Sequence, residues 1–255
     1  MVHKSKRSLP IELKGNNSRL NIQFVTTMDQ YYYDSVGKVM LNSFLDCTPS
    51  NFNINIYAEN ISSAFPNTDR LKLYDWNHCI YPTWKSWKNK TNIKKEIKFG
   101  KKGFAFIHAL ENISADYIVW TDADIFYLQN FDTSLIKYCC SSKYTIGLFS
   151  HNYLGEGISA ESGFVVVNKK HTKFDLFLET YKNAYNQKPD KIKKWYDGQV
   201  CMYAANKVDY FDLSLTKHFV DTHTPINHCP LNQYMLHEKG PTKKRLPPTY
   251  FERYL

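Results

Sequence analysis

Two aspartates, Asp122 and Asp124, directly follow a run of apolar residues in the stretch YIVWTDADIF. In an extended segment residues i and i+2 point to the same side, so both carboxylates can face one point. Such close like charges repel unless they share a proton or a cation. Hard divalent cations take oxygen ligands and leave positions open for substrate phosphates. A D-x-D pattern also arises by chance, but its place after an apolar strand favours a metal site over a structural pair.

A second group of candidate residues lies near the end of the chain, in HEKGPTK. Its spacing is H-x-x-G-x-x-K, with His237, Gly240 and Lys243. Histidine binds borderline metals, glycine lets the backbone approach a ligand closely, and lysine is a point charge suited to phosphate. The alternative is a polar tail with an ordinary surface lysine.

The hydrophobic periodicity predicts the elements that position these residues. Strands are expected at 21–28, 52–59, 117–124, 144–150, 162–168 and 208–213, and helices at 35–45, 102–113, 171–186 and 197–206. Residues 68–100, rich in Trp and Lys, are interpreted as an irregular insertion. The alternation of strands and helices indicates an α/β sheet, in which ligands bind at the carboxyl ends of the strands. The aspartate pair lies at such an end.

The composition indicates a folded chain, whose length allows one large domain or two small ones. Of the 255 residues, 43% are apolar, which supplies a sizeable core and excludes a disordered chain. We expect a polar N-terminal leader at residues 1–18 and a single α/β domain at residues 19–255.

The net charge of +9 favours anionic partners: phosphates, nucleic acids or anionic membrane surfaces. The six cysteines lack metal-ligand spacing, and no apolar run follows the basic N-terminus. We therefore expect no signal peptide and no transmembrane segment, a cytoplasmic protein with reduced thiols, and a surface compatible with peripheral membrane contact.

Taken together, the motifs resemble those of the GT-A nucleotide-sugar glycosyltransferases. They are most similar to the retaining group that includes glycogenin and bacterial α-galactosyltransferases, glycosyltransferase family 8, over residues 20–245. The matching segments are FVTTMDQYYYDSVGKVMLNSF, the D-x-D pair, ESGFVVVN, WYDGQV and HEKGPTKKR. The chain departs from the family where Lys244 and Arg245 replace a Pro-Trp pair, where Gly198 follows Asp197, and where Glu161 replaces a small polar residue.

This resemblance implies a GT-A fold, a mainly parallel sheet flanked by helices, and a role for each motif. Asp122, Asp124 and His237 would hold Mn²⁺ or Mg²⁺ on the diphosphate of a nucleotide-sugar donor, most simply a UDP-sugar. The other expected donor contacts are Thr26, Thr27, Tyr31, Tyr32, Lys102, Gly240 and Lys243. Asp197 and Glu161 are the candidate catalytic residues, although a helix-cap or surface role fits either one as well. The acceptor would be a glycan, a protein or a lipid-linked hydroxyl.

Other functions remain open at this stage. An inverting GT-A enzyme would use Asp197 as its base. A sugar nucleotidyltransferase would carry a Gly-rich basic loop after the first strand, which TTMDQYYYD does not provide. A non-catalytic sugar- or nucleic-acid-binding protein would show no metal dependence. Nucleic-acid binding would also depend steeply on salt, and we expect no nucleic acid partner.

Overall fold

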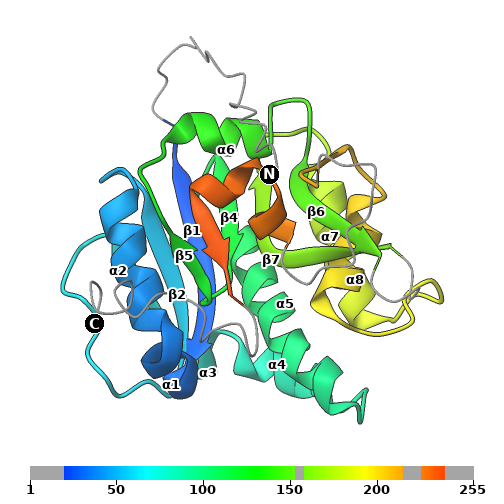
Figure 1. Ribbon diagram of the computed structural model, residues 1–255. Coiled ribbons are helices and arrows are strands. Elements are labelled where there is room, and N and C mark those ends of the chain that lie inside the picture. Colours follow the sequence, from blue (N-terminus) through cyan, green and yellow to red (C-terminus); the bar gives the residue numbers. More distant parts are fainter. Residues whose placement is uncertain (1–19, 153–157, 215–224, 239–255) are drawn as a thin grey trace, which may run out of the picture.

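The computed structural model describes residues 20–152, 158–214 and 225–238. Within these residues, one mixed sheet has the strand order β3-β2-β1-β4-β7-β6-β8 (Figure 1). Its strands are β1 (Ile22–Asp29), β2 (Asn53–Glu59), β3 (Leu71–Asp75), β4 (Tyr117–Thr121), β6 (Ile146–Asn152), β7 (Ile158–Asn168) and β8 (Tyr210–Asp212). Strands β3, β2, β1 and β4 are parallel, while β7 is antiparallel to both β4 and β6. The expected α/β class is confirmed.

Helices cover both faces of this sheet (Figure 1). They are α1 (Gln30–Tyr32), α2 (Lys38–Cys47), α3 (Trp76–Cys79), α4 (Tyr81–Lys88), α5 (Lys94–Asn112), α6 (Thr133–Cys139), α7 (Phe174–Asn186) and α8 (Asp197–Ala205), with a π-helical turn at Tyr33–Gly37. Helices α2 and α6 contribute to the core on one face, and α5, α7 and α8 to the core on the other. No helix of the described segments combines the length and apolarity that crossing a membrane requires.

The two cores exist because side chains alternate along each strand. In β4, Val119 packs into the core of α2 and α6, and the next residue, Trp120, packs into the core of α5, α7 and α8. A strand buried on both faces is apolar at nearly every position, which explains the run that precedes the aspartates.

The strand order reverses between β1 and β4. The chain runs from β1 outward to β2 and β3, and then returns through α5 to β4 on the other side of β1. Crevices at such switch points are the usual ligand sites of open α/β sheets. Asp29 ends β1 and Asp122 follows β4, so both lie at this crevice.

A second, two-stranded sheet brings a late segment to the same edge. It pairs β5 (Ile125–Tyr127) with β9 (Met235–His237) in antiparallel register, with Ile125 opposite His237. Two 3-10 turns, Pro225–His228 and Pro230–Gln233, lead into β9.

The expectation that residues 68–100 form an irregular insertion is wrong. This region holds β3, α3, α4 and the first part of α5. Strand β3 has only five residues, pairs only with β2 in the described sheet and leaves Leu73 half exposed, so its Leu-Lys-Leu alternation is too short to reveal a strand. Trp76, Trp84 and Trp87 are buried and anchor the two short helices to the sheet.

Candidate functional site

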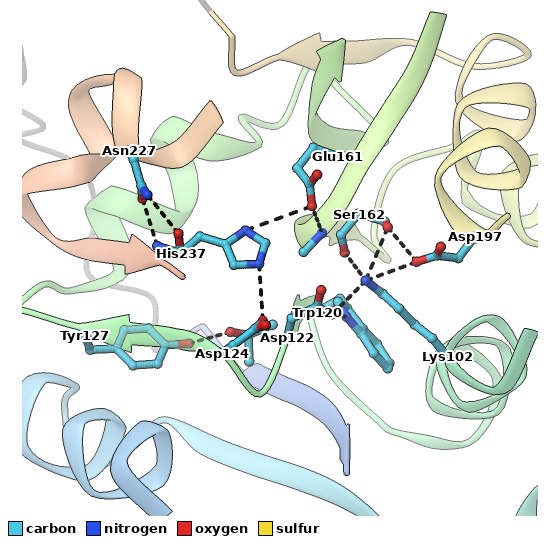
Figure 2. A network of polar contacts seen from close by, with 12 residues as sticks. Lys102, Trp120, Asp122, Asp124, Tyr127, Glu161, Ser162, Asp197, Asn227 and His237 are labelled. Atoms are coloured by element: carbon cyan, nitrogen blue, oxygen red, sulfur yellow. Dashed lines mark hydrogen bonds and ion pairs between the residues drawn. The ribbon is translucent and has the colours of Figure 1, made fainter. Parts of the chain in front are cut away.

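The first aspartate of the pair is held by a lysine from the neighbouring helix. Lys102 Nζ lies 2.7 Å from Asp122 Oδ1, and the indole Nε1 of Trp120 donates to the same oxygen at 2.8 Å (Figure 2). Trp120 and Asp122 are two residues apart and therefore face the same side, toward α5. The Lys102 ammonium also lies 5.3 Å from the centre of the Trp120 ring. Asp122 is thus oriented before any ligand arrives.

The same lysine reaches a second carboxylate. Lys102 Nζ is 3.1 Å from Asp197 Oδ2, at the start of α8, and donates to the carbonyl oxygen of Ser162 at 2.6 Å. The Ser162 hydroxyl donates to Asp197 at 2.5 Å. Burial works to lower the pKa of Lys102, but the charges of Asp122 and Asp197 outweigh it and hold that pKa above its ordinary value. Lys102 therefore stays cationic between the two carboxylates.

The second aspartate faces a histidine from the late segment. His237 Nε2 lies 3.2 Å from Asp124 Oδ1, and the His237 side chain is fully buried. The pairing of β5 with β9 sets this contact, because it places His237 beside Ile125, the residue after Asp124. The backbone N–H of Glu238 donates to the Asp124 carbonyl at 3.1 Å and extends the ladder.

His237 is held at its backbone by Asn227. The amide side chain of Asn227 accepts from His237 N–H at 2.8 Å and donates to the His237 carbonyl at 2.8 Å (Figure 2). On the other side, Gly163 leaves room for the imidazole, because a Cβ there would lie 2.4 Å from His237 Cε1. Position 163 therefore requires a residue without a side chain.

The arrangement fits a divalent cation. One ligand atom each from Asp122, Asp124 and His237 lies within 4.8 Å of the others. Both ring nitrogens of His237 are buried and make no hydrogen bond to the described residues. An unsatisfied buried polar atom costs about 1–3 kcal/mol, which ligation of a metal would offset. Two carboxylates and one imidazole form a donor set that suits Mn²⁺ and is compatible with Mg²⁺.

A cavity of about 520 Å³ opens beside these groups. Its lining comes from the ends of β1 and β2, from α1, α4 and one face of α5, and from the D-x-D segment. The lining residues are Thr27, Met28, Asp29, Tyr32, Glu59, Trp84, Lys94, Ile97, Lys98, Phe99, Lys101, Lys102, Asp122, Ala123 and Asp124. Its position at the switch point and its basic helix face suit an anionic ligand that spans from β1 to the aspartates.

The predicted donor contacts of the first strand and turn do not all reach this cavity. Thr27 and Tyr32 line it. Thr26 lies on the opposite face of β1 with a fully buried side chain, since neighbouring strand residues point to opposite faces. Tyr31 is 75% exposed and is not among the lining residues.

Lys102 departs from its expected setting. It was expected to open a helix, where a solvated lysine is the commoner role, but it lies inside α5 and is almost buried. Glu161 is buried beside His237, and Asp197 is buried beside Lys102 (Figure 2). Gly240 and Lys243 fall outside the described residues.

Sequence reasoning missed several supporting residues. Trp120 had a local signal, because it precedes Asp122 by two residues on the same strand face. Ser162 and Gly163 lie inside ESGFVVVN, but only the pairing of β7 with β4 shows that they border the aspartates. Asn227 had no signal, since a single asparagine in a short turn has no pattern.

No protein-family model and no curated protein sequence matches this chain. Solved structures do. The bifunctional glycosyltransferase WbbM superposes with a TM-score of 0.59 at 14% identity, over 89% of this chain and 47% of that chain. The galactosyltransferase LgtC, in complex with donor and acceptor sugar analogues, has a TM-score of 0.52 at 14% identity, over 91% of this chain and 93% of LgtC.

The glycosyltransferase GlyE of Streptococcus pneumoniae has a TM-score of 0.53 at 13% identity, over 92% of this chain and 60% of GlyE. This chain thus spans about half of WbbM and nearly all of LgtC. At these identities the likeness concerns the fold. The sheet order, the crevice at the end of β1 and β4 and these superpositions together show that the chain has the GT-A fold of the nucleotide-sugar glycosyltransferases.

Proposed function

We propose that this protein is a metal-dependent glycosyltransferase that moves a sugar from a nucleotide-sugar donor to an acceptor hydroxyl. One observation carries the proposal: Asp122, Asp124 and His237 converge within 4.8 Å beside a cavity at the switch point of a GT-A sheet. Asp122 and Asp124 lie together in the turn after β4, and His237 comes from β9, far along the chain. A purely structural role would not leave the buried imidazole without a hydrogen bond to any described residue.

Asp122, Asp124 and His237 are the residues that would hold Mn²⁺ or Mg²⁺. When bound, the cation supplies Lewis-acid stabilisation of the charge on the departing nucleoside diphosphate. The protein contributes orientation, because Lys102 and Trp120 fix Asp122 and because Asn227 fixes the backbone of His237.

A UDP-sugar is the proposed donor. Thr27 and Tyr32 line the part of the cavity nearest β1, where a nucleoside would lie, and an aromatic ring provides a surface for a base. The basic face of α5 favours the diphosphate. Gly240 and Lys243 remain predicted contacts of the same phosphates, with Lys243→Ala expected to slow leaving-group departure. Tighter binding of GDP than of UDP, measured by calorimetry with Mn²⁺, would contradict this donor assignment.

Asp197 is the proposed carboxylate on the sugar side of the site. Lys102 and Ser162 orient it next to Asp122. A fixed negative charge there would stabilise positive charge that develops on the transferred sugar. The resemblance to the retaining group favours an α-linked product from an α-linked donor, toward a glycan, protein or lipid-linked acceptor.

The test is a screen of nucleotide sugars for Mn²⁺-dependent hydrolysis, with the released sugar identified by NMR. We expect one UDP-sugar to be hydrolysed, and chelation to abolish the activity. With an acceptor in hand, NMR of the product gives its anomeric configuration. Release of pyrophosphate from a nucleoside triphosphate and a sugar phosphate would identify a nucleotidyltransferase instead. Absence of turnover with every donor would contradict the proposal.

A further inference from the structure

The imidazole of His237 lies between two carboxylates (Figure 2). Its Nε2 is 3.2 Å from Asp124 Oδ1, and its Nδ1 is 4.0 Å from Glu161 Oε1. All three side chains are buried. The ring thus has one nitrogen directed at the D-x-D pair and the other directed at Glu161.

The two nitrogens must have different roles if His237 holds a metal. A neutral imidazole has one N–H donor and one lone pair, and only the lone pair binds a cation. The nitrogen beside Asp124 is Nε2, so Nε2 is the nitrogen placed to share a cation with the D-x-D pair. The proton must therefore be on Nδ1, the nitrogen that faces Glu161.

Glu161 is itself fixed in place. The backbone N–H of Gly163 donates to Glu161 Oε1 at 3.0 Å, which is the oxygen nearest His237 Nδ1. A Cβ at position 163 would lie 2.4 Å from His237 Cε1 and 3.0 Å from Glu161 Oε1. The carboxylate and the imidazole therefore share a space that only a glycine leaves open.

We infer that Glu161 is a positioning residue of the metal centre: it accepts the Nδ1–H of His237, so that the Nε2 lone pair is directed at the cation held with Asp122 and Asp124. A movement of roughly 1 Å brings the Glu161–His237 distance to hydrogen-bond length. Metal-binding histidines almost always donate their second nitrogen to such a partner, whose loss costs about 10–100-fold in metal affinity. This inference rests on the proposed function, and it gives Glu161 a role that acts through His237 rather than on the sugar.

The first test reads the tautomer of His237 directly. NMR of the imidazole nitrogens is recorded on the metal-free protein at about pH 8, where an unperturbed histidine is neutral. We expect the wild-type protein to carry the proton on Nδ1, and Glu161→Gln to keep it there, because the amide oxygen can still accept. Glu161→Leu fills similar space without an acceptor and should shift the proton toward Nε2. A wild-type proton on Nε2 overturns the inference whether or not any variant folds.

The second test measures Mn²⁺ binding by calorimetry without a nucleotide. We expect Glu161→Leu to weaken binding by about 10–100-fold and Glu161→Gln by only a few fold. Glu111→Ala is the control, because it removes a carboxylate that pairs with Lys182 on the surface. Its affinity should equal that of the wild type. Equal losses of Mn²⁺ affinity in the Gln and Leu variants would mean that the charge of Glu161 acts on the metal directly. Unchanged affinity in both variants would mean that Glu161 has no role in metal binding. Either result overturns the inference.

Failure here is distinguishable from failure of the proposed function. Neither measurement needs sugar transfer. If no nucleotide sugar is turned over while the tautomer and Mn²⁺ affinity respond to Glu161 as expected, the proposed activity is wrong and the positioning role stands. If sugar transfer is observed while the His237 tautomer and the Mn²⁺ affinity are unchanged in the Glu161 variants, only the positioning role is wrong.

Discussion

Lys102 and Asp122 are 20 residues apart in the chain, and their charged atoms lie 2.7 Å apart in the structure. The lysine comes from the middle of α5 and the aspartate from the end of β4. Because Lys102 Nζ also lies 3.1 Å from Asp197, one largely buried cation joins a helix, a strand end and the start of α8. This junction orients Asp122 toward the cavity, and its loss should affect both stability and donor binding.

Replacing Lys102 tests this junction. Lys102→Met keeps most of the packing volume but leaves Asp122 and Asp197 without their shared cation. Removing one partner of a fully buried ion pair typically costs about 3–5 kcal/mol, and because this pair keeps some exposure to solvent, chemical denaturation should show a loss below that range but clearly above that of a surface pair. Adding Asp197→Asn to this variant should recover part of the lost stability, because it removes one of the two uncompensated negative charges.

The matched control for that experiment is Lys101→Met. Lys101 pairs with Glu59 in a more exposed setting, where such pairs contribute about 0–1 kcal/mol. If the two lysine variants lose equal stability, the Lys102 contacts are ordinary surface contacts and the junction described above is not what holds this edge together.

Asp124→Asn tests the metal site. The asparagine has the same shape but a weaker ligand, and it also relieves repulsion between the two carboxylates. We expect transfer activity and metal-dependent UDP binding to be largely abolished, while the melting temperature without metal stays within about 3 °C or rises. The exposed Asp209→Asn serves as the control, since Asp209 pairs only with surface Lys173 among the described residues. If Asp124→Asn keeps full activity, or if the wild-type activity survives chelation, the two aspartates have a structural role and do not bind a catalytic metal.

Asn227 provides a test of how His237 is held. Asn227→Ala removes two hydrogen bonds to the His237 backbone without removing a metal ligand. We expect Mn²⁺-dependent UDP binding to weaken, but less than in His237→Ala. Asn232→Ala is the control, since that side chain is exposed and, within the part of the chain that the structure describes, bonds only the Asn227 carbonyl. If calorimetry gives Asn227→Ala the same UDP affinity as the control, β9 keeps its register without the two Asn227 hydrogen bonds.

Glu96 gives a prediction on pH. This buried carboxylate of α5 accepts from Trp195 N–H at 2.8 Å and from the Thr91 hydroxyl at 2.6 Å, and so ties α5 to the segment before Asp197. Burial works to raise its pKa, but these hydrogen bonds and Lys188 outweigh it and hold the pKa below its ordinary value of 4.5. A depressed pKa contributes stability that is present above the unfolded value and lost as pH falls through the folded value.

Glu96→Gln should therefore be less stable than the wild type at neutral pH, by about 1–3 kcal/mol for hydrogen bonds to a charged group. The difference should shrink as the pH falls below about 4.5, because the wild-type carboxylate becomes protonated and loses its advantage. Urea titrations across this pH range measure it, with the exposed Glu179→Gln as the control. If the stability difference between the two proteins stays constant with pH, the charge of Glu96 does not contribute to stability.

Local patterns in the sequence determined most strands and the aspartate pair. The buried strands β1, β2, β4 and β7 were predicted within a few residues, with two differences. Strand β7 begins earlier than expected, and β4 ends at Thr121, so the aspartates lie in a turn that Ile125 N–H closes on the Asp122 carbonyl and not in the strand expected to run to residue 124. The position of Asp122 and Asp124 after an apolar strand also followed from neighbouring residues alone. Strand periodicity is a short-range property, because alternate side chains meet the same face of the sheet.

What the sequence could not determine was how distant segments meet. Pairing of β5 with β9 decides that His237 faces Asp124, and pairing of β4 with β7 decides that Glu161 and Gly163 border the imidazole. The lysine-rich start of α5 gave no sign that Lys102 would lie largely buried between two carboxylates. Strand register and helix placement are set by packing across the whole sheet, so a motif can name the ligands while only the tertiary structure decides which atoms surround them.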